Sequence, residues 1–412
     1  MASRQNRSPE DVAAKAGGLL MRLGLAVLMI ALPLAAIYSR RLVFTLMPVG
    51  AGLIFAGAAL VPGNRVLADI RRALATPVAI AAVALCLWIA ISLLWTPFVK
   101  AAFEQLAKCL GTIGLAFVVI AALPGRSRIS NLNLMPIGAG ISAVAAAAMV
   151  LVAPGIIPNS GDLELSTLER AAVGLVLLVW PALAALGIRE RWAWGGALAV
   201  AVTSAAVAVW TPAAMTGMAA GALVFSLSTA NPRRMSWILA AFFALLLLGA
   251  PALLILADHW LATFPGVPSS LAQPVAALAD LVRESPGRLL TGFGYNTLGR
   301  ATAGGLLPVN IPTTLALEVW FELGALGAVL VAAVVAGSFV AAGRIEGNGA
   351  AFLLAGETCI LVIAFWGLAT LQLWWITLLG ATAISFGIVL KGQMREERPG
   401  VGAIRTAPQP AV

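Results

Sequence analysis

Uninterrupted apolar runs of about twenty residues constrain this chain more than any other feature. Such runs have the length of a membrane-crossing α-helix, whereas a transmembrane β-barrel shows alternating segments of about ten residues. With 61% hydrophobic and only 10% charged residues, the chain carries more apolar surface than one soluble core can bury. We therefore expect an all-α, polytopic integral membrane protein with about twelve transmembrane helices, near residues 17–38, 42–61, 78–96, 106–123, 134–154, 171–188, 193–210, 214–230, 235–257, 314–342, 350–371 and 374–390.

Basic residues indicate how these helices are oriented. If the N-terminus is inside and each run crosses once, only eight of the 26 Lys and Arg residues fall on the outer side, and 18 fall on the cytoplasmic side. Cytoplasmic loops of membrane proteins are enriched in Lys and Arg. This bias explains the net charge of +9 without a nucleic-acid partner. We expect both termini in the cytoplasm and no bound nucleic acid.

The same topology divides the chain into five parts. They are a cytoplasmic N-tail (1–16), helices one to nine (17–257), a large periplasmic loop (258–313), helices ten to twelve (314–390) and a cytoplasmic C-tail (391–412). The loop is the only long connection, and long loops in compact proteins are usually functional. Apolar residues at helical spacing, such as Val275 and Leu278, predict an amphipathic helix in it, lying on the outer membrane–water interface.

Four arginines on the outer side run against the orientation rule. Arg283, Arg288 and Arg300 lie in the loop, and Arg170 lies at the outer end of the sixth run. Arginine binds phosphate through parallel charge-assisted hydrogen bonds, so these four are candidate pyrophosphate ligands. Alternatively, they pair with neighbouring carboxylates such as Asp280, Glu284 and Glu169, or contact lipid headgroups.

Three further residues are candidates for acid–base chemistry. His259, the single histidine, follows Asp258 and could be a general base, or it could anchor the membrane interface together with Trp260. Glu318 and Glu322 share one helical face, and intramembrane carboxylates usually face a cavity or a partner. A structural role for Glu322, in capping or pairing with an arginine, is an equal alternative.

Buried carboxylates also keep a transporter open as an alternative, with Glu357 of the next run as a third such group. The three cysteines lie in or beside apolar runs and indicate packing rather than disulfides or zinc. No motif indicates a metal or a cofactor, so we expect neither.

Four stretches resemble the O-antigen ligase and O-antigen polymerase superfamily of bacterial membrane glycosyltransferases. They are 87–97, with its Trp and Ser residues; 169–172, where Arg170 follows an acidic loop; 286–294, which ends in Gly-x-Gly; and 313–327, with its Glu-Leu-Gly-x-x-Gly block. The last resembles the family most specifically. It differs in one respect, because Thr313-Thr314 stands where the family has His-Asn.

The resemblance implies a metal-independent transferase in the bacterial inner membrane. Its donor would be an undecaprenyl-diphosphate-linked glycan, bound by arginines at the periplasmic face, and its acceptor a lipid or a glycan. Since Thr313 cannot act as a base near neutral pH, His259, Glu318 or Glu322 would replace the family histidine, or the reaction would need no strong base. The alternative is a non-catalytic partner of other polysaccharide-assembly proteins.

Overall fold

The structure, a computed structural model, describes residues 9–61, 66–124, 129–156, 161–263, 269–284, 287–305, 307, 314–367 and 372–391. These residues form helices and connecting turns, without a strand. The helices are α1 (Pro9–Ala26), the π-helical turn η1 (Val27–Ala31), α2 (Leu32–Tyr38), α3 (Arg40–Ala59), α4 (Val66–Leu74), α5 (Pro77–Ser92), α6 (Val99–Ala122), α7 (Ile129–Leu132), α8 (Leu134–Ile156), α9 (Gly161–Gly187), α10 (Trp192–Ala208), α11 (Pro212–Ser228), α12 (Pro232–Leu248), α13 (Ala250–Thr263), α14 (Ser269–Glu284), α15 (Arg288–Thr291), α16 (Leu298–Ala303), α17 (Leu315–Ala342), α18 (Gly349–Phe365) and α19 (Leu373–Lys391).

The predicted all-α membrane architecture is confirmed. All twelve apolar runs are helical, and among the described residues seven helices are long and apolar enough to cross a membrane. Two bent pairs, α4–α5 (77°) and α12–α13 (64°), raise that number to nine. The other three predicted runs are α10, α11 and α18, which have 17 residues each and therefore the minimum length for a crossing.

Large apolar side chains cover much of the outer surface of this bundle. Trp194 is 69% exposed, Trp210 71% and Leu245 71%. In water this surface would drive association, whereas lipid tails solvate it at no cost. The exposed side chains therefore support a membrane location for the helices.

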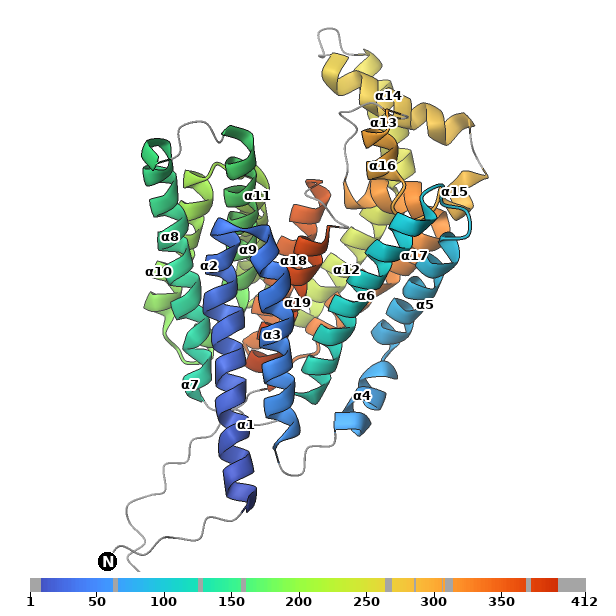
Figure 1. The fold of residues 1–412 in the computed structure, drawn as a ribbon. Helices are drawn as coiled ribbons and strands as arrows, with labels where there is room; N and C mark the ends of the chain where they lie inside the picture. Colours follow the sequence, from blue (N-terminus) through green and yellow to red (C-terminus); the bar gives the residue numbers. More distant parts are fainter. Residues whose placement is uncertain are drawn as a thin grey trace, which may run out of the picture.

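The helices pack as two groups around α9 and α17 (Figure 1). The first group surrounds α9, whose 167–187 segment is almost fully buried, and contains α2, α8, α10, α11, α18 and α19. The second contains α5, α12 and α17. Figure 1 shows α13–α16 at one end of the molecule and α4 and α7 at the other, as expected if the 258–313 loop and the basic loops near 71–72 and 126–128 face opposite sides.

The ninth predicted run is not a single helix, because the chain bends between α12 and α13 at Gly249. A bend leaves carbonyl groups without their helical partners. The indole of Trp320 in α17 donates to one of them, the Leu247 carbonyl, over 2.7 Å. α13 then continues to Thr263, inside the predicted loop.

Within that loop, the predicted amphipathic helix is present as α14. Its Leu278 is 4% exposed and packs with Leu254 of α13 and Leu298 of α16, and Val275 packs against the same cluster. The described part of the apolar face of α14, at Val275 and Leu278, is thus covered by protein, whereas the expectation was contact with the membrane interface. The short helices α15 and α16 were not predicted.

Helix α17 is the largest departure from the sequence expectation of one continuous crossing at 314–342. Gly324 has φ 65° and ψ −164°, which no helix contains. Leu315 and Val331 line one cavity, although a straight helix would separate them by about 24 Å. The helix therefore consists of two segments that meet at a break at Gly324, and we call this arrangement the elbow. Its N-terminal arm, 315–323, is named the crossing segment, and its C-terminal arm, 325–342, is named the spanning segment.

Candidate functional site

At the elbow, three carbonyl groups of α17 accept hydrogen bonds from donors outside the helix. The backbone N–H of Phe293 donates to the Phe321 carbonyl over 2.8 Å, and that of Gly294 to the Glu322 carbonyl over 2.9 Å. The indole of Trp88 in α5 donates to the Leu323 carbonyl over 2.9 Å. Buried carbonyls need such partners, so the break in α17 and the loop after α15 form one unit.

Two glycines make this backbone approach possible. Gly292 (φ 71°, ψ −179°) and Gly324 both have backbone angles that are essentially restricted to glycine. A Cβ on Gly324 would lie 2.5 Å from the carbonyl carbon of Leu290 and 2.6 Å from the nitrogen of Gly292. A Cβ on Gly292 would in turn lie 2.6 Å from the nitrogen of Leu323.

The carboxylate of Glu322 holds the next part of the loop. One oxygen accepts the backbone N–H of Asn296 over 2.8 Å, and the other accepts that of Leu298 over 3.1 Å. Glu322 is 2% exposed. It therefore caps the start of α16 across the fold, which is the structural role that the sequence left open. The capped turn also fixes the position of Arg300, two residues further on.

The end of α5 completes the support of the loop. Ser92 accepts the backbone N–H of Tyr295 over 3.2 Å, and the Thr96 hydroxyl donates to the Tyr295 carbonyl over 3.1 Å. Thr96 also lies 3.2 Å from the hydroxyl of Thr297. These three hydroxyl-bearing residues were not predicted individually. The signal for Ser92 and Thr96 was the resemblance of 87–97 to the family.

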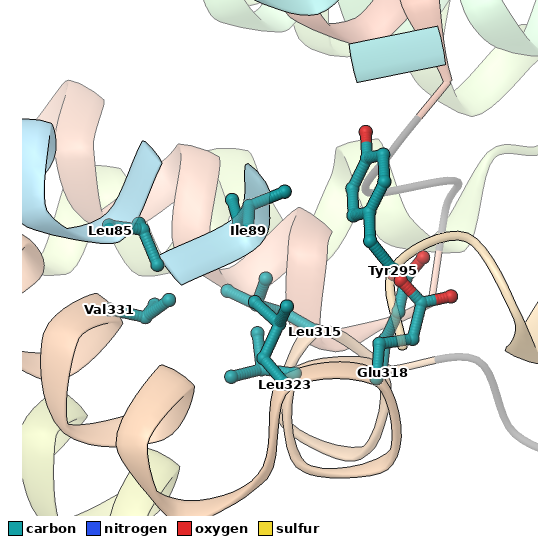
Figure 2. A pocket seen from close by; sticks show the side chains of 9 residues that line it. Leu85, Ile89, Tyr295, Leu315, Glu318, Leu323 and Val331 are labelled. Carbon is teal, nitrogen blue, oxygen red and sulfur yellow. The ribbon is translucent and has the colours of Figure 1, made fainter. Parts of the chain in front are cut away.

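A cavity of about 130 Å³ lies inside the elbow, between α5 and α17 (Figure 2). Figure 2 shows Tyr295 and Glu318 at one end and aliphatic side chains, among them Leu85 and Val331, at the other. The carboxylate of Glu318 has no hydrogen bond or ion pair within the part of the chain that the structure describes. The surface that lines the cavity is apolar, so the cavity favours an apolar group.

Of the four candidate arginines, Arg283 is neutralised. Its guanidinium lies 2.7 Å from the carboxylate of Asp258 and 2.8 Å from that of Asp280. The hydrogen bonds to Asp258 and Asp280 raise the pKa of Arg283. This outcome is the carboxylate pairing that the sequence analysis named as the alternative to phosphate binding.

Arg288 and Arg300 differ from Arg283, because the described residues contain no carboxylate within salt-bridge distance of either guanidinium. Both are exposed and lie at the two ends of the supported 292–298 segment. The guanidinium of Arg288 lies 5.7 Å from the centre of the Phe293 ring. Cations stacked on an aromatic ring keep a free edge for hydrogen bonding. These two arginines are available to an anion at the loop end of the molecule.

The structure does not bring Arg170 or His259 to this unit. Arg170 lies on α9 and lines a separate small pocket, with its guanidinium 5.9 Å from the ring of Trp374. His259 is exposed on α13 and does not line the elbow cavity. Thr313, where the family has histidine, lies outside the described residues.

The described residues contain no group of three or more His, Cys, Asp or Glu side chains that could hold a metal ion. The cysteines Cys86, Cys109 and Cys359 are free, two of them buried, in agreement with the packing role expected from the sequence.

Comparison of the sequence with protein-family models and with curated proteins finds no match.

Proposed function

We propose that this protein is a metal-independent glycosyltransferase of the bacterial inner membrane that acts on an undecaprenyl-diphosphate-linked glycan at the periplasmic face. Its acceptor is a lipid or a growing glycan in surface polysaccharide assembly. The proposal combines the resemblance to the O-antigen ligase and polymerase superfamily with the arrangement of the elbow.

One observation carries the proposal. At the elbow of α17, hydrogen bonds join three of the four stretches that resemble the family, namely 87–97, 286–294 and 313–327. The partners in these bonds are up to 235 positions apart in the sequence. The unit that they form presents Arg288 and Arg300 without carboxylate partners. The fourth stretch, with Arg170, lies in the other helix group, and we do not include it in the proposed pyrophosphate site.

The chemistry requires little beyond positioning and charge stabilisation. A diphosphate is a good leaving group, and two arginines that neutralise its developing charge lower the barrier to its departure. The apolar surface beside the loop allows the isoprenoid chain to remain in lipid. Membrane lipid is thus both the solvent for the helices and the source of the substrate.

The proposal is tested by binding and by phenotype. For the purified protein in nanodiscs, we expect undecaprenyl diphosphate to bind more tightly than undecaprenyl monophosphate. Arg288→Ala and Arg300→Ala should each weaken that binding roughly 10- to 150-fold, the value of one charge-assisted contact. Arg344→Ala, which removes an exposed arginine beyond the far end of α17, should leave it unchanged.

Deletion of the gene should shift the length or the attachment of surface glycan on a gel. An unchanged glycan profile together with equal affinity for the two lipids would exclude this function.

A membrane transporter is the second candidate. Transporters place their sites at broken helices, and the break at Gly324 lies beside a cavity and two carboxylates. A transporter would show substrate uptake that depends on Glu318 or Glu357 and a normal glycan profile after deletion.

A further inference from the structure

The two carboxylates of the crossing segment lie one helical turn apart and have different surroundings. Both oxygens of Glu322 are occupied by backbone N–H groups, and its side chain is buried. Glu318 is partly exposed, borders the apolar cavity, and its carboxylate has no donor among the described residues. A carboxylate in such a place is costly unless a ligand supplies the missing hydrogen bond.

The other polar groups near the cavity cannot serve as a proton acceptor. Burial raises the pKa of the Tyr295 hydroxyl above its ordinary value, so the phenol remains neutral at physiological pH. That hydroxyl also lies 4.0 Å from the sulfur of Cys109, on the side away from Glu318. His259 is exposed on another helix and lines no part of the cavity.

Glu318 is also linked to Arg300 through one turn of α17 and the hydrogen bonds of Glu322. It precedes Glu322 by one turn of α17, and Glu322 caps the turn that begins α16, which carries Arg300. Any movement of the crossing segment therefore moves Glu318 and Arg300 together. A proton acceptor and a charge-stabilising group need this kind of fixed separation.

We propose that Glu318 is the catalytic base that accepts the proton of the acceptor hydroxyl, an inference that rests on the function proposed above. The acceptor oxygen forms a bond to the anomeric carbon of the donor glycan as its proton passes to the Glu318 carboxylate. The bond between that carbon and the diphosphate oxygen breaks, and its electron pair stays on the diphosphate. Arg288 and Arg300 neutralise this charge, and Glu318 returns the proton to water.

The test compares Glu318→Gln, which keeps the shape but accepts no proton, with Glu318→Asp and with the unchanged protein in nanodiscs. The donor is the lipid-linked glycan extracted from the deletion strain, with its native acceptor fraction. We expect Glu318→Gln to lower the rate of transfer by about 10²- to 10⁴-fold. Binding of undecaprenyl diphosphate should be unchanged, and Glu318→Asp should recover part of the rate.

Two outcomes would overturn the inference. In the first, Glu318→Gln transfers glycan at the rate of the unchanged protein. In the second, it loses lipid binding together with transfer, which makes Glu318 a structural or binding residue. The proposed function fails in a different way, because the unchanged protein then neither discriminates undecaprenyl diphosphate from the monophosphate nor transfers glycan.

Discussion

Substitution of Gly324 by alanine tests whether the elbow and the loop are one unit. The new Cβ would lie 2.5–2.6 Å from backbone atoms of Leu290 and Gly292, which no side-chain rotation can relieve. A glycine-only backbone conformation costs an L-residue about 1–3 kcal/mol, and overpacking adds about 1–3 kcal/mol. We expect Gly324→Ala to destabilise the docked loop by about 2–6 kcal/mol.

Hydrogen exchange followed by mass spectrometry measures this directly. The amides of Phe293 and Gly294 donate to α17, so their exchange should accelerate at least about 30-fold, which corresponds to 2 kcal/mol. Gly299→Ala is the matched control, since a Cβ there meets nothing within 4 Å and alanine favours the α16 helix. Equal exchange in the two variants would refute the reasoning.

Three other perturbations test separate parts of the same region. Glu322→Leu leaves two buried N–H groups without an acceptor and should lower the free energy of unfolding by roughly 2–5 kcal/mol. Glu322→Gln should lower it less, and thermal unfolding in detergent compares the two variants. Trp88→Phe removes the donor to the Leu323 carbonyl and should cost about 1–3 kcal/mol by the same measurement. In a background without native cysteines, Gly299→Cys should react with an impermeant maleimide from outside the cell, and Arg344→Cys only after permeabilisation; labelling from one side would contradict the topology.

Much of the fold follows from the sequence, because hydropathy and length alone decide where helices form in lipid. The apolar runs were predictable in this way, and α14 was predictable from the helical spacing of its apolar residues. The break in α17 was not. Its hydropathy continues without interruption through Gly324. Two of the donors that stabilise the break come from a loop 28 residues earlier, and the third is Trp88 of α5.

The candidate site likewise has features that the sequence predicts and features that only the structure shows. Exposed arginines in an outer loop can be recognised from orientation and charge, so Arg288 and Arg300 were predictable. Arg283 differs from these two because it pairs with Asp280 on its own helix and with Asp258, which α13 brings into contact from 25 positions away. Likewise, spacing makes Glu318 and Glu322 equivalent, and only the position of the α16 backbone assigns the cap to Glu322.

The hydrogen bonds that join α5 to the distant loop and to α17 can form only late in synthesis of the chain. Ser92 and Trp88 leave the ribosome 203 and 235 residues before their partners Tyr295 and Leu323. At about 5–20 residues per second, this interval is roughly 10–45 s. During it, the polar end of α5 is already inserted but lacks the partners that later bury it. Nascent chains halted before Leu323 should therefore remain sensitive to proteases and dependent on membrane chaperones at this end of α5.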